Sequence, residues 1–152
     1  MATDPKRPAD DPFNFARFVT AQEGAYERAY REIVAARKDS HWMWFVFPQL
    51  SGLGHSDMAR RYAISGLPEA EAYMEHPVLG PRLLECCEAL LKIEGRSASE
   101  IFGYPDDLKL RSSMTLFAQV SRSRDACRSV LDQCLGGKGD DRTLSLLASL
   151  RA

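Results

Sequence analysis

The sequence lacks an excess of charge of either sign and any long apolar run. Its 152 residues include 20 basic and 21 acidic side chains, which gives a formal net charge of −1. Such a chain has no bulk attraction to phosphate backbones or acidic lipids, so we expect neither nucleic acid nor a membrane as a partner. The longest apolar run, residues 42–47, is far shorter than the roughly 18 residues of a spanning helix. Residues 1–11 lack the apolar core of a signal peptide, so we expect a cytoplasmic protein.

Motifs for metal or redox chemistry are also missing. No cysteine pair has C-x-x-C spacing, and no histidine pair has the spacing of a helical zinc site. The adjacent Cys86 and Cys87 are poorly placed to bridge each other. Cys127 and Cys134 would lie roughly 10 Å apart on a helix, which is too far for a disulfide. We therefore predict buried, reduced thiols, no metal site and no cofactor.

Apolar residues recur at helical spacing along most of the chain. The repeat of i, i+3, i+4 and i+7 is clear in residues 26–34, 79–91 and 127–135. Polar residues that cap helix starts precede several such stretches, at Asp11, Ser56 and Ser97 among others. These patterns predict an all-α fold. We expect a single compact domain of about seven or eight helices, several of them short, over residues 11–152, after a disordered tail at 1–10.

Both tryptophans lie in residues 40–50, SHWMWFVFPQL. As a helix this segment is apolar on every side, so it forms either the centre of the core or the wall of an apolar cavity. In the first case His41 marks the polar mouth of a buried helical turn. In the second, Trp42 and Trp44 stack on a ring such as a base or nicotinamide, with His41 and Gln49 at its edges.

A glycine-containing turn follows at residues 51–56 and leads into a helix. Gly54 permits close approach of the backbone, Ser56 caps the helix, and Arg60 lies in its first turns. Together these groups could hold a phosphate or carboxylate. The pattern matches neither a Walker A loop nor a dinucleotide fingerprint, so a plain capped helix is the alternative.

The segment 106–117 is predicted as a helix with two polar residues on its apolar face. At 100° per residue, Lys109 and Ser113 fall among leucine, methionine and phenylalanine side chains. A lysine there must reach water, pair with a carboxylate or meet a ligand, and Asp106 one turn earlier is the expected partner. Either the pair is structural, or His41, Asp106 and Lys109 form an acid–base set.

Three stretches resemble a widespread family of small bacterial proteins. They are SHWMWFVFPQL at 40–50, HPVLGPRL at 76–83 and IFGYPDDLKLRSSMTLF at 101–117. The family is known as domain of unknown function 1810, and some members carry the label calpastatin. The likeness extends from about Asp11 to Leu147. It implies a single, mainly α-helical domain, but it brings no established reaction, substrate or catalytic residue.

Two functions are consistent with these residues. The first is an enzyme or binding protein for a small anionic, nucleotide-like ligand, held in a cleft between the Trp-rich segment and the start of the 106–117 helix. It requires these residues to converge, with Gly54, Ser56 and Arg60 holding the anion. The second is a non-catalytic helical interaction module with an exposed apolar patch. We favour the first, because packing alone does not explain a lysine and a serine on an apolar helix face.

Overall fold

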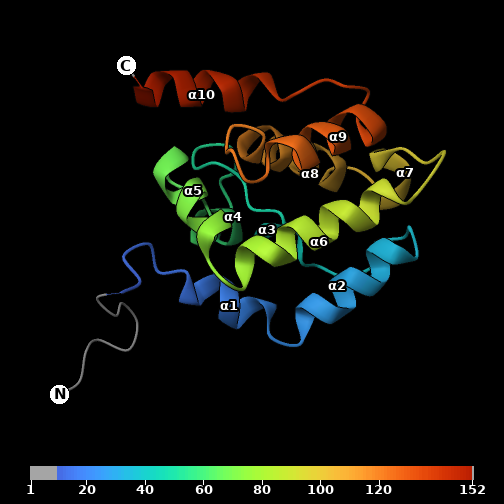
Figure 1. Ribbon diagram of the computed structural model, residues 1–152, viewed down its shortest axis with the longest axis horizontal. Helices are drawn as coiled ribbons and strands as arrows, with labels where there is room; N and C mark the ends of the chain where they lie inside the picture. Colours follow the sequence, from blue (N-terminus) through green and yellow to red (C-terminus); the bar gives the residue numbers. More distant parts are fainter. Residues whose placement is uncertain (1–9, 152) are drawn as a thin grey trace.

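The computed structural model describes residues 10–151 and contains helices but no strand in that range (Figure 1). These residues form α1 (Ala16–Gln22), α2 (Ala25–Val34), α3 (Met43–Val46), α4 (Asp57–Arg61), α5 (Leu67–Glu75), α6 (Leu79–Leu91), α7 (Ala98–Phe102), α8 (Asp106–Phe117), α9 (Arg124–Cys134) and α10 (Asp141–Arg151). The all-α fold is confirmed. Ten helices appear in this range, and seven of them have seven residues or more, which fits the expected seven or eight with several short ones. The remaining three, α3, α4 and α7, have only four or five residues each.

The start of the first helix differs from the prediction. Asp11 was expected to cap a helix directly, but α1 begins at Ala16. Asn14 adopts a left-handed φ of 57°, which keeps the intervening residues in turns. The Asp11 carboxylate still accepts the backbone N–H groups of Phe15 (2.7 Å) and Ala16 (3.0 Å), so it caps α1 from a distance. The tail expected at residues 1–10 lies outside the described residues except for its last one.

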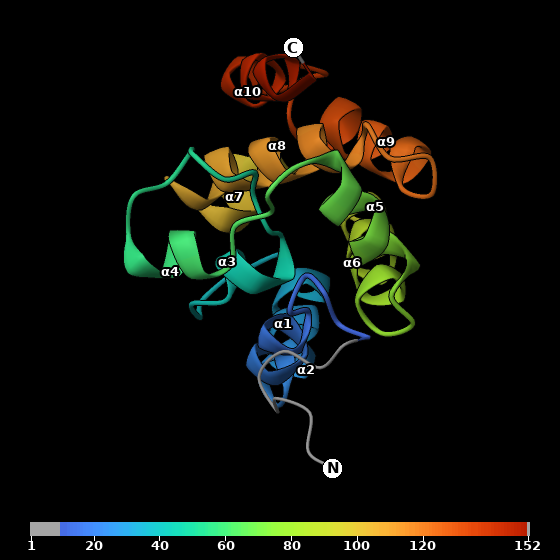
Figure 2. The same cartoon turned by 90° about the vertical axis from the view of Figure 1, so that its left-hand side faces the viewer.

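Helix α6 lies at the centre of the arrangement. It packs against α2 on one side and α9 on the other, and α5 leads into it through a tight turn (Figure 1). Short α3 lies between α1 and α8, as Figure 2 shows. With 13 residues, α6 is the longest helix of the described part, where none is long and apolar enough to cross a membrane.

The turn between α5 and α6 is defined by His76 and Gly80. His76 Nδ1 accepts the N–H groups of Val78 (3.1 Å) and Leu79 (3.3 Å) and thereby caps α6. A Cβ atom on Gly80 would lie 2.1 Å from the carbonyl oxygen of Met74. Glycine at this position therefore permits the close approach of α5 to α6.

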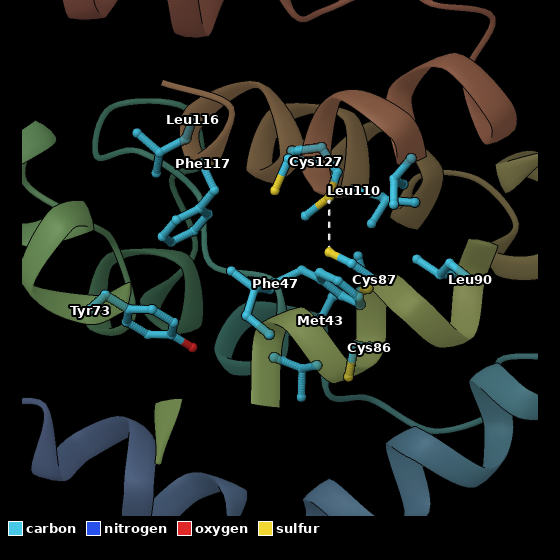
Figure 3. Packing of buried hydrophobic residues seen from close by; sticks show 14 of the residues in the cluster. Met43, Phe47, Tyr73, Cys86, Cys87, Leu90, Leu110, Leu116, Phe117 and Cys127 are labelled. Carbon is cyan, nitrogen blue, oxygen red and sulfur yellow. Dashed lines mark hydrogen bonds between the residues drawn. The ribbon is translucent and has the colours of Figure 1, made fainter. Parts of the chain in front are cut away.

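The four cysteines are free and buried, which confirms the prediction of reduced core thiols. Figure 3 shows Cys87 and Cys127 in the apolar space between α6 and α9, with Cys87 Sγ 3.8 Å from the sulfur of Met114. Burial raises the pKa of the Cys86 thiol to about 12. The Cys86 thiol thus stays protonated, and all four side chains pack as small apolar groups.

Arg17 of α1 connects two segments that are far apart in the sequence. Its side chain is 17 % exposed and pairs with the buried Glu69 of α5 at 3.0 Å. The guanidinium also donates to four backbone carbonyls, those of Phe13, Asn14, Arg61 and Ala63. One planar group with several donors thereby fixes the chain before α1 to the end of α4 and the chain that follows it.

Candidate functional site

The Trp-rich segment forms α3 and its flanks at the centre of the core, which confirms the predicted buried helical turn. Trp42 is 1 % exposed, and its indole N–H donates to Glu32 of α2 at 2.8 Å. Trp44 is only half-buried and packs against the core from outside. Trp42 is therefore a packing residue with almost no ring surface for a ligand, while Trp44 keeps part of its ring in contact with solvent.

Glu32 organises the chain that precedes α3. Its carboxylate accepts the backbone N–H groups of Asp39 (2.8 Å) and Ser40 (2.9 Å), the Ser40 hydroxyl (2.6 Å) and the Trp42 indole. Burial alone would raise the pKa of Glu32, but the hydrogen bonds from Ser40, Trp42 and Asp39 outweigh it and lower the pKa to about 2. The sequence contains no local signal for this role, because all three partners lie beyond the end of α2.

Asp106, at the start of α8, binds two lysines. Lys109 Nζ lies 3.5 Å from Oδ1, which is the pair predicted from the sequence. Lys38 Nζ lies closer, 2.7 Å from Oδ2, and also donates to the carbonyl oxygen of Ser40. The Lys38 side chain is 6 % exposed, against 26 % for Lys109. Lys38 is thus the main partner of Asp106, and sequence patterns did not identify it because it lies far from α8 along the chain.

Both lysines also lie over tryptophan rings. Lys38 Nζ is 5.0 Å from the ring centroid of Trp42, and Lys109 Nζ is 4.8 Å from that of Trp44. These are cation–π distances. The Trp-rich segment and the start of α8, which the sequence singled out separately, are therefore in direct contact.

Ser113 lies one turn beyond Lys109 and is fully buried. Its hydroxyl has no hydrogen-bond partner among the described residues. The predicted placement of this serine on the apolar face of α8 is confirmed, and its complete burial keeps it from direct contact with a ligand in solution.

A hollow of about 530 Å³ opens beside Trp42, between the start of α2 and the chain that leads to α3. It is lined by Gly24, Ala25, Arg28, Asp39, Ser40, His41 and Trp42. Gly24, with a φ of 73°, is the N-cap of α2, and no side chain caps this helix. The exposed Arg28 and His41 both border the hollow. His41 and Trp42 thus share one concave surface, whose walls do not include Asp106 or Lys109.

The predicted anion-holding residues Gly54, Ser56 and Arg60 do not line the hollow beside Trp42. Ser56 caps α4 by accepting the N–H of Ala59 at 3.1 Å, as expected for a capped helix after a turn. Of the residues expected to converge on one cleft, His41 borders this hollow, but Lys109 and these three residues do not. Sequence motifs do not specify the distances between segments, so they could not establish this arrangement.

Gln49 is half-buried and follows α3. Its backbone carbonyl accepts the N–H of Ile64 at 2.9 Å, and the N–H of Ser51 donates to the Ile64 carbonyl at 2.8 Å. These bonds form an isolated parallel bridge between Leu50 and Ile64. The backbone of Gln49 thus fixes the chain after α3, away from the residues that line the hollow beside Trp42.

Comparisons with known proteins agree with this fold. A family model described as "Protein of unknown function (DUF1810)" matches residues 12–147. A solved structure, the conserved hypothetical protein Rv1873 from Mycobacterium tuberculosis, superposes with a TM-score of 0.88. It shares 54 % sequence identity, and the match covers 91 % of this chain and 99 % of that one. No curated protein matches. The chain therefore belongs to the DUF1810 family of proteins of unknown function.

Proposed function

We propose that this protein binds a small anionic ligand in the hollow between the start of α2 and residues 39–42. The observation that carries the proposal is that Arg28 and His41 border this hollow together with the N-terminus of α2, which no side chain caps. Free amide groups and the positive end of the helix dipole favour an anion. The volume of about 530 Å³ is in the range typical of small-molecule sites, so it has room for a nucleotide-like ligand.

Arg28 has no ion-pair partner among the described residues, because the nearby carboxylates bind other groups. Asp39 pairs with the exposed Arg37 at 3.6 Å. The Glu32 carboxylate already accepts four hydrogen bonds. Among the described residues no carboxylate lies within ion-pair distance of Arg28, so its planar donors are available to a phosphate or carboxylate.

In this proposal the start of α8 positions the site and does not bind the ligand. Lys38 holds Asp106 at 2.7 Å and donates to the carbonyl of Ser40, which lines the hollow. Asp106 and Lys38 would thereby fix residues 39–42 from one side, while Glu32 fixes them from the other. Of His41, Asp106 and Lys109, the predicted acid–base set, only His41 would touch the ligand.

Isothermal titration calorimetry with inorganic phosphate, ribose 5-phosphate and AMP tests the proposal. We expect at least one of these probes to bind the wild type. Arg28→Ala should weaken that binding at least about tenfold, because a hydrogen bond to a charged group contributes about 1.5–3 kcal/mol. Arg31→Ala is the matched control, since Arg31 is exposed on the last turn of the same helix.

The control should bind with wild-type affinity. Absence of binding by all three probes would refute the proposal. Equal binding by wild type, Arg28→Ala and Arg31→Ala would refute the assignment to this hollow.

A further inference from the structure

A second hollow, of about 450 Å³, lies between α2 and the start of α6. Its lining combines an apolar wall with one guanidinium and two carboxylates. The residues are Tyr26, Glu27, Pro77, Val78, Pro81, Arg82 and Glu85. It shares no lining residue with the hollow of the proposed function, so the two can be tested separately.

Arg82 and Glu85 are opposite charges one turn apart on α6, a spacing at which such residues commonly pair. No ion pair joins them in the described structure. Tyr26 of α2 instead contacts both. The Arg82 guanidinium lies 4.7 Å from the centroid of the Tyr26 ring, and the Tyr26 hydroxyl donates to Oε1 of Glu85. A single tyrosine therefore keeps the two charges apart at the edge of the hollow.

The two charged groups are held in place but keep binding capacity. Arg82 donates one hydrogen bond, at 3.1 Å, to the side-chain oxygen of Gln22, and the described residues offer its guanidinium no other acceptor. Gln22 is 2 % exposed and is itself fixed by a 2.7 Å bond to the carbonyl of Phe45. Glu85 uses only Oε1, so Oε2 has no partner among the described residues. A guanidinium that can accept a bidentate anion thus lies beside a carboxylate that can accept an ammonium group.

The surrounding charges exclude the simpler ligands. A plain anion that binds Arg82 would meet the carboxylates of Glu27 and Glu85, and a plain cation that binds Glu85 would meet the guanidinium. A ligand that carries an anionic and a cationic group close together can bind Arg82 and Glu85 at the same time. The wall formed by Pro77, Val78 and Pro81 adds an apolar surface for a side chain.

We propose that this hollow binds a free α-amino acid with an apolar side chain. The carboxylate of the ligand receives hydrogen bonds from Arg82, its ammonium group donates to Glu85, and its side chain packs against the proline and valine wall. Tyr26 is the positioning residue, because its ring supports the guanidinium and its hydroxyl orients the carboxylate.

The test is a titration of the ¹⁵N-labelled full chain, followed by amide chemical shifts. The probes are L-leucine, 4-methylpentanoate, which lacks the ammonium group, and 3-methylbutylamine, which lacks the carboxylate. We expect leucine to shift the amide signals of residues 24–30 and of the non-proline residues of 78–86. Each analogue should bind at least about tenfold more weakly, because each loses one charge-assisted contact. Absence of shifts at millimolar leucine, or shifts only elsewhere, would overturn the proposal.

Two variants separate the contributions of the charges. Arg82→Met keeps an apolar stem on the Tyr26 ring but removes the donors, and Glu85→Gln keeps an acceptor for the tyrosine hydroxyl but removes the charge. Each should weaken leucine binding at least about tenfold, while Glu85→Gln should not weaken binding of 4-methylpentanoate. Glu88→Gln, exposed on the next turn of α6, is the control and should bind leucine like the wild type.

If Arg82→Met fails to fold, Glu85→Gln and the two analogues still decide the question. Unchanged leucine binding by Glu85→Gln would overturn the assignment of an amino acid, since the ammonium contact would then contribute nothing. Equal loss of binding in Glu88→Gln would show that the effect is not specific to the hollow and would overturn it as well.

Discussion

Replacing Glu32 by glutamine should loosen residues 39–42 from α2. A glutamine side chain has one acceptor oxygen and no charge, so it cannot receive all four hydrogen bonds that the carboxylate receives from Asp39, Ser40 and Trp42. The Trp42 indole N–H and the Ser40 hydroxyl then compete for one acceptor. We expect a lower free energy of unfolding and weaker ligand binding in the hollow that these residues line.

The pKa of Glu32 gives the magnitude. It lies at about 2, against an ordinary value of 4.5, so the proton dissociation constant differs by about 2.5 powers of ten. At about 1.4 kcal/mol for each power of ten, the ionised carboxylate contributes at most about 3.5 kcal/mol. Because Glu32 keeps part of its surface in water, screening reduces this to about 1–2 kcal/mol. In a domain of this size, such a loss lowers the melting temperature by about 2–8 °C.

The pH dependence identifies the charge as the cause. A lowered pKa stabilises the fold fully above the unfolded value of 4.5, and this stabilisation is lost as the pH falls towards 2. Urea unfolding of the wild type and Glu32→Gln should therefore differ by about 1–2 kcal/mol at pH 7 and by less at pH 3. Glu71→Gln, exposed on α5, is the control and should match the wild type. Equal stability of the wild type and Glu32→Gln at pH 7, or a difference that does not change with pH, would refute the reasoning.

Five further substitutions probe the packing and the buried polar contacts, and urea unfolding measures each of them. Gly80→Ala should cost about 3 kcal/mol or more, because the new Cβ would lie 2.1 Å from a carbonyl oxygen of α5, and a near-native midpoint would contradict this. Ser113→Ala should be neutral or stabilise by up to about 1 kcal/mol, since its buried hydroxyl has no partner. Ser123→Ala should cost about 1–2 kcal/mol, because its buried hydroxyl donates to the last carbonyl of α8 at 2.7 Å. Similar changes in stability for Ser113→Ala and Ser123→Ala would contradict the hydrogen-bond argument. Lys38→Met should cost about 3 kcal/mol and Lys109→Met less than about 1 kcal/mol, because only the Lys38 ion pair is buried. A larger loss of stability in Lys109→Met than in Lys38→Met would contradict this argument.

The features that the sequence predicted correctly depend on neighbours along the chain. The capping box of Ser97 and Glu100 is present, because both of its hydrogen bonds lie within one turn. Ser56 caps α4, and Lys109 meets Asp106 one turn away, for the same reason. Helical periodicity likewise identified the buried faces of the long helices, since each face is a property of one segment.

The features that the sequence missed depend on contacts between distant segments. Lys38 reaches Asp106, and Glu32 reaches Trp42 only because the chain turns back after α2. Tyr26 and Arg82 come from different helices, and no spacing rule connects them. The apolar pattern of residues 42–47 did not distinguish Trp42 from Trp44, although only Trp44 keeps contact with solvent. Which side of an all-apolar turn is exposed depends on the segments that pack around it.

The hydrogen bonds of the Arg17 guanidinium couple the local unfolding of two segments. It binds carbonyl groups both before α1 and at and just beyond the end of α4, so neither segment can detach without breaking bonds to the same side chain. Amide hydrogens of residues 15–19 and 62–66 should therefore exchange with solvent in one shared event, with similar opening free energies. A lysine at this position has three donors on one ammonium group, so it cannot make all of these hydrogen bonds and would couple the exchange of the two segments more weakly.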